Sequence, residues 1–576
     1  MNAQEKYQAW CESSDYDEAT KKELYEIAGN EEAIRERFGK DLDFGTGGLR
    51  GILGAGTNRM NIYTVRKATQ GLAQVILAEN GAKRGVVIAY DSRRMSPEFA
   101  EEAALCLGAN GIKTYVFESL RPTPELSFAV RKLKCIAGIV ITASHNPPTY
   151  NGYKVYWEDG GQITFPKDKE ILKQIERITD VKKIKTITRE EALKKSLYVS
   201  IGWEIDEAYI RALKELSLRP AVLKAAAKQL KIVYTPLHGS GAVLMQKGLR
   251  ELGFLQLYTV KEQEQPDGSF PTVASPNPEE AAAFTLALKL AKEVDADIIL
   301  ATDPDADRLG VMVKDRKTGE YIRFTGNMSG VMIAEYLLRS RKEQNALPEQ
   351  GALLRTIVTT KMADALAREY QIDIISVLTG FKYIGEQIKL MEATGKAEYL
   401  FGFEESYGCL TGTYARDKDA IGAALMLCEA AVFYKSQNRT LWEELLTLYE
   451  KYGYFREDLY AVTLTGQAGS EKIKAAMERF RSEESAHLGK WKLLKIYDYK
   501  NGEIKDLTTG KKLPTDLPRA NVMYYLLEQE AWCCVRSSGT EPKIKFYVGV
   551  KGNSLKEADQ KLQELMETIV AAADLA

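Results

Sequence analysis

Apolar runs rich in β-branched residues alternate with amphipathic stretches along most of this chain. Residues 85–93 (GVVIAYDSR) predict an apolar strand that ends at polar residues, and residues 96–111 (SPEFAEEAALCLGANG) predict a helix. Pro97 suits the first helical turn, and Gly111 lies past the helix end. Residues 112–119 (IKTYVFES) predict a second strand.

The same order of strand, turn, helix and strand returns in residues 231–260 and 353–378. Such units build sheets covered by helices, so the pattern predicts an α/β protein of three related domains with mixed sheets. Residues 519–550 differ, because two strand-like runs flank a loop there, and an amphipathic helix over 555–573 closes the chain. We expect a fourth, α+β domain, with boundaries at 1–198, 199–314, 315–452 and 453–576. The run 180–196 is predicted to be a solvated helix and connector.

In each α/β domain a further apolar strand ends in an unusual polar loop. These loops are TASHNPP (142–148), TDPDADR (302–308) and GFEESYG (402–408). Ligands of α/β sheets collect beyond the carboxyl ends of strands. We therefore expect the domains to present their loops to one central cleft.

Composition narrows the class of protein. The 576 residues exceed what one core usually serves, and 45% hydrophobic with 28% charged residues is typical of soluble globular chains. The net charge of −1 favours neither nucleic acid nor a membrane surface as a partner, so local groups must bind any anionic ligand. Seven scattered cysteines without a CxxC pair, and no apolar leader or membrane-length run, predict a cytoplasmic location.

The aspartates of DPDAD point to a metal site. If Asp303, Asp305 and Asp307 lie in an extended segment, alternate side chains face the same way, and three carboxylates together require a cation. Oxygen ligands select Mg²⁺ or Mn²⁺. An EF-hand is excluded, because its sixth position would be Arg308 and its twelfth Lys314. An acidic turn that caps the next element is the alternative.

Ser144 is the candidate for group transfer. TASHNP lacks the GxSxG elbow of acyl-transfer serines, and a serine facing Mg²⁺ suits phosphoryl transfer. It could also cap a helix. Three further segments offer ligands for anions or sugar hydroxyls. Arg50 stands in a flexible glycine-rich loop (45–51), which could instead be a simple turn. Glu404 and Ser406 stand in GFEES, which could instead begin a helix, and RSSGT, which could instead be a hairpin loop, contains Arg536, Ser538, Gly539 and Thr540.

Taken in this order, TASHNP, DPDADR, GFEES and RSSGTEPK resemble the α-D-phosphohexomutase superfamily over nearly the whole chain. The stretch SHNPPTYNGYKVY (144–156) is most similar to the long phosphoglucomutase branch, which includes phosphopentomutase-type enzymes. The phosphate loop departs from the glycine-rich or arginine-ending versions of other branches, which leaves the role of Lys545 open.

The resemblance implies roles for specific residues. Ser144 would be the phosphoserine, and its phosphate with the three aspartates would hold one Mg²⁺. Lys154 would be the acid–base group, with Arg50 and His145 as active-site neighbours. Substrate contacts would come from Arg308, Thr379, Glu404, Ser406 and Lys418, and the non-reacting phosphate would be bound by Arg536, Ser538, Gly539 and Thr540.

The resemblance also implies an activity: interconversion of glucose 1-phosphate and glucose 6-phosphate, with glucose 1,6-bisphosphate as intermediate and activator. Small sugar phosphates would be the partners, and either a monomer or a dimer is compatible with the sequence. Phosphopentomutase and phosphomannomutase are alternatives within the class. A metal-dependent sugar phosphatase, or a sensor that binds without turnover, would be a different class.

Overall fold

The structure is a computed structural model that describes residues 1–45, 48–464, 466–482, 485–537 and 543–575. The chain forms two compact units. Unit 1 comprises Met1–Gly326, Phe381–Tyr399 and Ser406–Asn438, and unit 2 comprises Asn327–Gly380, Leu400–Glu405 and Arg439–Ala576. No helix in the described ranges has the length and apolar character needed to cross a membrane.

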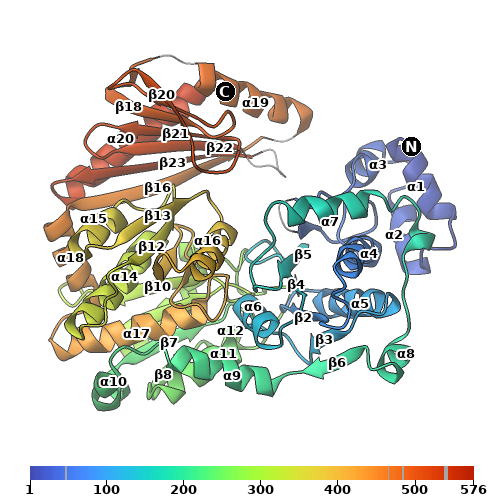
Figure 1. Cartoon of the computed structure of the whole chain (residues 1–576), viewed down its shortest axis with the longest axis horizontal. Coiled ribbons are helices and arrows are strands. Elements are labelled where there is room, and N and C mark those ends of the chain that lie inside the picture. The colour runs from blue at the N-terminus through green and yellow to red at the C-terminus, as the bar shows by residue number, and fades with distance from the viewer. Residues whose placement is uncertain (46–47, 465, 483–484, 538–542, 576) are drawn as a thin grey trace. The chain divides into compact units, whose positions relative to one another are not determined.

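Three short helices open unit 1, each begun by a polar cap. The side chains of Asn2, Asp17 and Asn30 accept hydrogen bonds from backbone N–H groups of the first turn. Aromatic residues, among them Trp10 stacked on Tyr16, form their small core. The helices are α1 (Ala3–Glu12), α2 (Glu18–Glu26) and α3 (Glu31–Phe38) (Figure 1).

The first sheet has the strand order β1-β5-β4-β2-β3-β6. Strand β4 pairs parallel with β2 and antiparallel with β5, and it is buried along its whole length. The strands are β1 (Gly48–Ile52), β2 (Val86–Tyr90), β3 (Thr114–Phe117), β4 (Ala137–Ile141), β5 (Tyr150–Trp157) and β6 (Tyr198–Ile201). The helices are α4 (Ile62–Ala78), α5 (Ser96–Ala109), α6 (Thr123–Lys132), α7 (Lys167–Glu176), η1 (Val181–Lys183) and α8 (Arg189–Lys194).

Strand β1 corrects one expectation, because Arg50 lies in a strand and not in a flexible loop. Its register partner in β5 is Gly152. A side chain at Gly152 would meet the carbonyl oxygens of Thr142 and Leu49 at 2.4 and 2.9 Å. The glycines of this region therefore serve close strand pairing rather than loop flexibility.

The second sheet has the order β11-β10-β9-β7-β8, with β7 parallel to β8 and β9 and with β9 antiparallel to β10. Its strands are β7 (Lys231–Thr235), β8 (Gln256–Thr259), β9 (Ile298–Thr302), β10 (Leu309–Lys314) and β11 (Tyr321–Phe324). The other elements of unit 1 are α9 (Trp203–Lys214), α10 (Pro220–Ala226), η2 (Ala227–Gln229), α11 (Ala242–Glu251), α12 (Lys261–Glu264), η3 (Ala281–Phe284), α13 (Thr285–Val294), α16 (Phe381–Thr394), β15 (Cys409–Leu410) and α17 (Ala420–Ser436).

Unit 2 begins with a parallel pair of strands, β12 (Gly351–Thr356) and β13 (Asp373–Val377), beside β14 (Glu398–Phe403). Its C-terminal part is an antiparallel sheet of order β16-β23-β22-β21-β18-β19-β20. The strands are β16 (Tyr454–Thr463), β17 (His487–Leu488), β18 (Trp491–Asp498), β19 (Glu503–Asp506), β20 (Lys511–Pro514), β21 (Val522–Leu527), β22 (Trp532–Ser537) and β23 (Lys543–Gly552). The helices are α14 (Gly326–Glu343), α15 (Met362–Tyr370), α18 (Leu441–Tyr452), α19 (Gly466–Ser482) and α20 (Leu555–Ala573).

The predicted fold class is confirmed: three α/β segments precede a C-terminal segment dominated by an antiparallel sheet (Figure 1). Helix α20 covers the predicted residues, and it packs on β23. The predicted solvated helix and connector in 180–196 are found as helix α8, which is preceded by the short turn η1 and a non-helical stretch.

Candidate active site

Ser144 lies just beyond the carboxyl end of β4, in a loop without helix. Its backbone adopts φ 52°, in the left-handed region, and its N–H donates to Thr142 Oγ1 at 2.8 Å. Non-glycine residues in that region cost energy and are frequent at functional sites. The alternative that Ser144 caps a helix is wrong, because no helix follows it.

Arg93 fixes the serine loop through hydrogen bonds to its backbone. Its guanidinium donates to the carbonyl oxygens of Ser144 and Asn146, to that of Pro147 at 2.9 Å and to that of Tyr150 at 3.1 Å. Only 1% of Arg93 is exposed, and Asp91 lies 3.4 Å away as its ionic partner. This buried clamp fixes the path of the loop on both sides of the serine.

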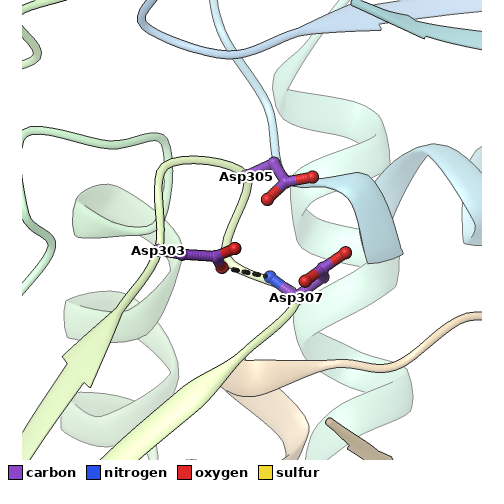
Figure 2. Close-up of side chains that lie close together, drawn as sticks. All are labelled: Asp303, Asp305 and Asp307. Carbon is purple, nitrogen blue, oxygen red and sulfur yellow. Dashed lines mark hydrogen bonds between the residues drawn. The ribbon is translucent and has the colours of Figure 1, made fainter. Parts of the chain in front are cut away.

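Asp303, Asp305 and Asp307 lie in the tight turn between β9 and β10 (Figure 2). The expectation of an extended segment is wrong, because Ala306 adopts φ 50° and Asp303 Oδ1 accepts hydrogen bonds from the N–H groups of Asp307 and Arg308, each at 3.1 Å. The carboxylates converge through this turn, with one oxygen of each within 4.8 Å of the others.

The two loops meet inside unit 1. Ser144 Oγ donates to Asp303 Oδ2 at 2.6 Å, although 159 positions separate the residues. A second bridge comes from the first residue of α6, because Thr123 Oγ1 donates to Asp305 Oδ2 and its N–H donates to the Asp305 carbonyl, both at 2.9 Å. The serine loop and the aspartate turn therefore form one site.

The aspartates fit a hard divalent cation. All three are at most 1% exposed, and Oδ1 of both Asp305 and Asp307 has no hydrogen-bond partner among the described residues. A buried carboxylate oxygen without a partner is costly, and a metal ion would satisfy it. The donors are all oxygens, as Mg²⁺ prefers. Asp303, Asp305 and Asp307, with an oxygen on Ser144, could hold such an ion.

Two lysines partly balance the acidic charge. Lys154 Nζ lies 2.9 Å from Asp305 and 3.5 Å from Asp307, and Lys418 Nζ lies 2.8 Å from Asp307. Burial works to lower the pKa of Lys154, but the two carboxylates outweigh it and raise that pKa. Burial opposes ionisation of Asp305, yet the Lys154 ammonium holds the pKa of that carboxyl below its ordinary value.

Asp303 behaves in the opposite way. Burial and then the charges of Asp305 and Asp307 raise the pKa of Asp303 well above its ordinary value. The pKa values of Asp303 and Asp305 are thus shifted in opposite directions. Such strongly perturbed pKa values are typical of functional sites, which makes the cluster a candidate for chemistry.

Three other predicted residues surround the serine. His145 Nδ1 lies 3.2 Å from Ser144 Oγ, and burial, with the charges of Arg308 and Arg50, lowers its pKa well below the ordinary value. His145 is therefore neutral. Arg50 donates to the Asn146 side chain at 3.1 Å, and Arg308 pairs with Glu279.

The remaining predicted residues lie in different places. Ser406 belongs to unit 1, next to Tyr407, whose carbonyl accepts from the N–H of Leu309 at 3.0 Å. Glu404 and Thr379 belong to unit 2. The alternative of a helix start in GFEES is wrong, because residues 405–407 form bends and no helix begins there.

Arg536, on β22 of unit 2, faces Lys545 of β23 in register. Ser538, Gly539 and Thr540 lie outside the described residues. Their predicted binding of phosphate stays a prediction.

Sequence reasoning missed Thr123 and Arg93. Arg93 stands in the motif DSR at a predicted strand end, which could have marked it, because polar residues at such ends often serve ligands or loops. Nothing in the sequence marks Thr123, whose partner lies 182 positions away.

Comparison with known proteins places this geometry in a family. Three family models match in chain order: phosphoglucomutase/phosphomannomutase α/β/α domain I over residues 41–182, domain II over 207–319 and domain III over 325–452. Phosphoglucomutase of Staphylococcus saprophyticus is 36% identical over 96% of this chain and 98% of its own. That of Staphylococcus aureus strain MRSA252 is 35% identical over 92% of this chain and 94% of its own.

Two solved structures share the fold at low identity. One is the open form of the Paramecium phosphoprotein pp63/parafusin, a phosphoglucomutase, with a TM-score of 0.67 and 17% identity over 93% of this chain and 96% of its own. The other is a phosphoglucomutase/phosphomannomutase family protein from Burkholderia thailandensis, with a TM-score of 0.64 and 19% identity over 92% of this chain and 97% of its own. The serine loop and the aspartate turn lie within the first two matched domains, and the two relatives match 96% and 92% of the chain. The chain is thus a mutase of the phosphoglucomutase/phosphomannomutase family, within the α-D-phosphohexomutase superfamily.

Proposed function

We propose that this enzyme is a phosphoglucomutase that interconverts glucose 1-phosphate and glucose 6-phosphate through a phosphorylated Ser144 and glucose 1,6-bisphosphate. The observation that carries the proposal is the 2.6 Å contact between Ser144 Oγ and the buried aspartate cluster. The phosphoglucomutase relatives at 35–36% identity support glucose as the sugar.

In the proposed cycle, phosphorylated Ser144 donates its phosphoryl group to the free hydroxyl of the sugar phosphate. The bisphosphate turns around in the site, and Ser144 takes back the other group. Mg²⁺ held by Asp303, Asp305, Asp307 and the serine phosphate would neutralise charge on the moving group. Arg93 keeps the serine loop fixed in both steps, because its four carbonyl contacts do not involve the hydroxyl.

Lys154 is the proposed proton carrier. Its pKa is raised because Asp305 and Asp307, with a smaller contribution from Asp417, attract the ammonium. Once those carboxylates share their charge with a metal ion, burial favours the neutral amine, which can accept the proton of a sugar hydroxyl. His145 is already neutral and can accept a hydrogen bond beside the serine.

The other predicted residues keep their proposed roles. Arg308 and Lys418 carry positive charge beside the aspartates, which suits the sugar phosphate. Glu404, Ser406 and Thr379 would bind sugar hydroxyls. Arg536, Ser538, Gly539 and Thr540 would bind the non-reacting phosphate.

The test combines mass and kinetics. Intact-protein mass spectrometry should find one added phosphate after incubation with glucose 1,6-bisphosphate, and Ser144→Ala should lose both that phosphate and turnover. Ser436→Ala, on the far end of α17, is the matched control and should keep both. A panel of the 1-phosphates of glucose, mannose and ribose, with inorganic phosphate release recorded, should show the highest kcat/KM for glucose.

Three outcomes would contradict the proposal. Near-normal activity in Ser144→Ala would remove the serine from the mechanism. A preference for mannose 1-phosphate or ribose 1-phosphate would reassign the sugar. Stoichiometric release of inorganic phosphate would make the enzyme a phosphatase.

A further inference from the structure

Unit 2 contains a second candidate binding site, a cavity of about 300 Å³. Its walls come from β12, β13 and the segment before α15 on one side, and from β18, β19, β21 and the segment after β20 on the other. Its charged and aromatic lining residues are Arg355, Lys361, Asp516, Tyr497, Tyr499 and Tyr524. None of the residues predicted to bind the substrate or its phosphates lines it.

Arg355 brings a buried cation to this cavity. It is 6% exposed, and its guanidinium contacts the Asp364 carboxylate at 3.0 Å and the Thr356 carbonyl at 3.1 Å. Its Nε is buried and has no hydrogen-bond partner in the part of the chain that the structure describes. A buried N–H donor without an acceptor is costly, so the hydrogen bonding of this guanidinium is only partly satisfied.

Lys361 brings a second cation, at the N-terminal end of α15. Among the described residues no carboxylate lies within ion-pair distance of its ammonium. Burial, and then the charge of Arg355, lower its pKa to about 8, although the charges of Asp364 and Glu530 act in the opposite direction. The Asp364 carboxylate contacts Arg355, and Asp516 also lines the cavity, so two carboxylates accompany the two cations, although neither forms an ion pair with Lys361.

Three tyrosine rings form an aromatic wall. Tyr497 lies edge-on to Tyr524 with ring centroids 5.5 Å apart, and it stacks with Tyr499 at 6.1 Å. Such a wall offers apolar area together with phenol hydroxyls that donate hydrogen bonds. A cavity of this size has room for a small organic molecule and not only for an inorganic ion.

We propose that this cavity binds a small phosphate monoester, with the phosphate on Arg355 and Lys361 and the organic group against the tyrosine rings. Guanidinium and ammonium groups together are the usual partners of phosphate, and the bound dianion would give the Lys361 ammonium an anionic partner. The site is separate from Ser144 and the aspartate turn, which belong to unit 1, and it does not depend on the proposed function.

Lysine footprinting on the wild-type enzyme tests this site locally. The protein is treated at pH 7.5 with an N-hydroxysuccinimide acetate reagent, and acetylation of Lys361 is followed by peptide mass spectrometry. Inorganic phosphate, phenyl phosphate and glucose 6-phosphate are the probes, with sodium chloride at equal ionic strength as the control. Lys511, exposed on β20, reports on general reactivity.

The two monoesters should slow acetylation of Lys361 by about tenfold at ten times their Kd, at lower concentrations than inorganic phosphate requires, with Lys511 unchanged. Arg355→Gln should lose the protection while Lys361 remains reactive. If the variant fails to fold, the wild-type result decides. Equal labelling with and without the esters would overturn the proposal, as would protection by chloride alone or by inorganic phosphate as strongly as by the esters.

Discussion

Thr123 is one of the residues that connect the aspartate turn to the serine-bearing domain. Its hydroxyl and its backbone N–H both donate to Asp305, the aspartate that Lys154 also contacts. A group that fixes a metal-binding carboxylate without touching the metal sets the carboxylate's orientation. Thr123 is therefore a positioning residue.

Replacing Thr123 by valine should raise the Mg²⁺ concentration for half-maximal activity by about 10- to 100-fold, because Asp305 loses a hydrogen bond that orients it. Thr123→Ser should restore most of the affinity, since it keeps the hydroxyl. The measurement is activity as a function of Mg²⁺ concentration. Thr114→Val is the control, because Thr114 is equally buried but donates to the Leu197 carbonyl. An unchanged Mg²⁺ requirement in Thr123→Val would refute the positioning role.

At this scale, sequence could locate reactive groups but not their supports. Ser144 and the aspartates stand in dense polar motifs that interrupt apolar strands, so their chemistry is visible locally. Thr123 and Arg93 act through contacts with residues 182 and 51 to 57 positions away, and these contacts exist only once the sheets have formed. The raised pKa of Lys154 was also hidden, because it depends on which carboxylates burial brings near.

At the scale of elements, the serine loop has its shape because Arg93, which follows strand β2, donates hydrogen bonds to the carbonyl oxygens of the loop. The Asp91 carboxylate accepts hydrogen bonds from Thr142 Oγ1 at 2.6 Å and from Ser96 Oγ at 2.8 Å. These bonds connect the C-terminal ends of β2 and β4 with the start of α5. Burial of Asp91 would be costly without the charge of Arg93. The loop is thus anchored to the sheet by one ionic network.

Arg93→Lys should lower kcat by about 100-fold, because an ammonium cannot reach four carbonyl oxygens and a shift of the serine by about 1 Å is enough for such a loss. The KM for the sugar phosphate should change much less. Steady-state kinetics measures both. Arg84→Lys provides the comparison, since Arg84 also donates to two backbone carbonyls of unit 1 but lies at the surface. Equal effects of the two substitutions would show that the clamp has no catalytic role.

Strand β16 of unit 2 carries a buried carboxyl, Glu457. Burial raises its pKa to about 7, against the opposing hydrogen bonds from Thr360 and Asn327. The folded state therefore binds the proton more tightly than the unfolded state. Between pH 4.5 and 7 the free energy of unfolding should fall as pH rises, by about 3 kcal/mol in all, and it should level off above pH 7.

Glu457→Gln should remove this pH dependence, because the amide stays neutral, so the variant should be the more stable protein at pH 8. Hydrogen exchange of the β16 and β23 amides at pH 5 and pH 8 gives the local free energy of opening. Glu503→Gln, in β19, is the control. A wild-type protein whose opening free energy does not fall relative to Glu457→Gln between these pH values would contradict the expectation.

The sequence predicted the type of most elements and missed those set by tertiary contacts. Helix α20 follows from its amphipathic period. The glycines of β1 predict a flexible loop from sequence alone, because they fit a strand only when β5 lies beside it. The aspartates converge through a turn with a left-handed Ala306, which alternation along an extended segment could not reveal.

At the scale of the molecule, the candidate site residues divide between the two compact units as well as among the four predicted domains. Ser144, Lys154, the three aspartates and Lys418 all belong to unit 1, although Lys418 comes from a segment that follows part of unit 2 in the chain. Arg536 and the second cavity belong to unit 2. The predicted domain limits are consecutive ranges, whereas each compact unit combines segments that are separate in the chain.

The location of the proposed metal ligands predicts which unit a bound metal ion should stabilise. Because every proposed ligand lies in unit 1, Mg²⁺ should stabilise that unit by about 2.7 kcal/mol at 100 times its Kd, and hydrogen exchange of the segments around Ser144 and the aspartate turn should slow accordingly. Exchange in β23 of unit 2 should not change. Peptide-resolved exchange with EDTA or with Mg²⁺ measures both. Asp305→Asn should abolish the difference, whereas Asp297→Asn, near the other end of β9 and paired with Lys435, should retain it. Slower exchange throughout both units would show that the ion binds elsewhere or couples the units, and no change around Ser144 would remove the metal from the serine site.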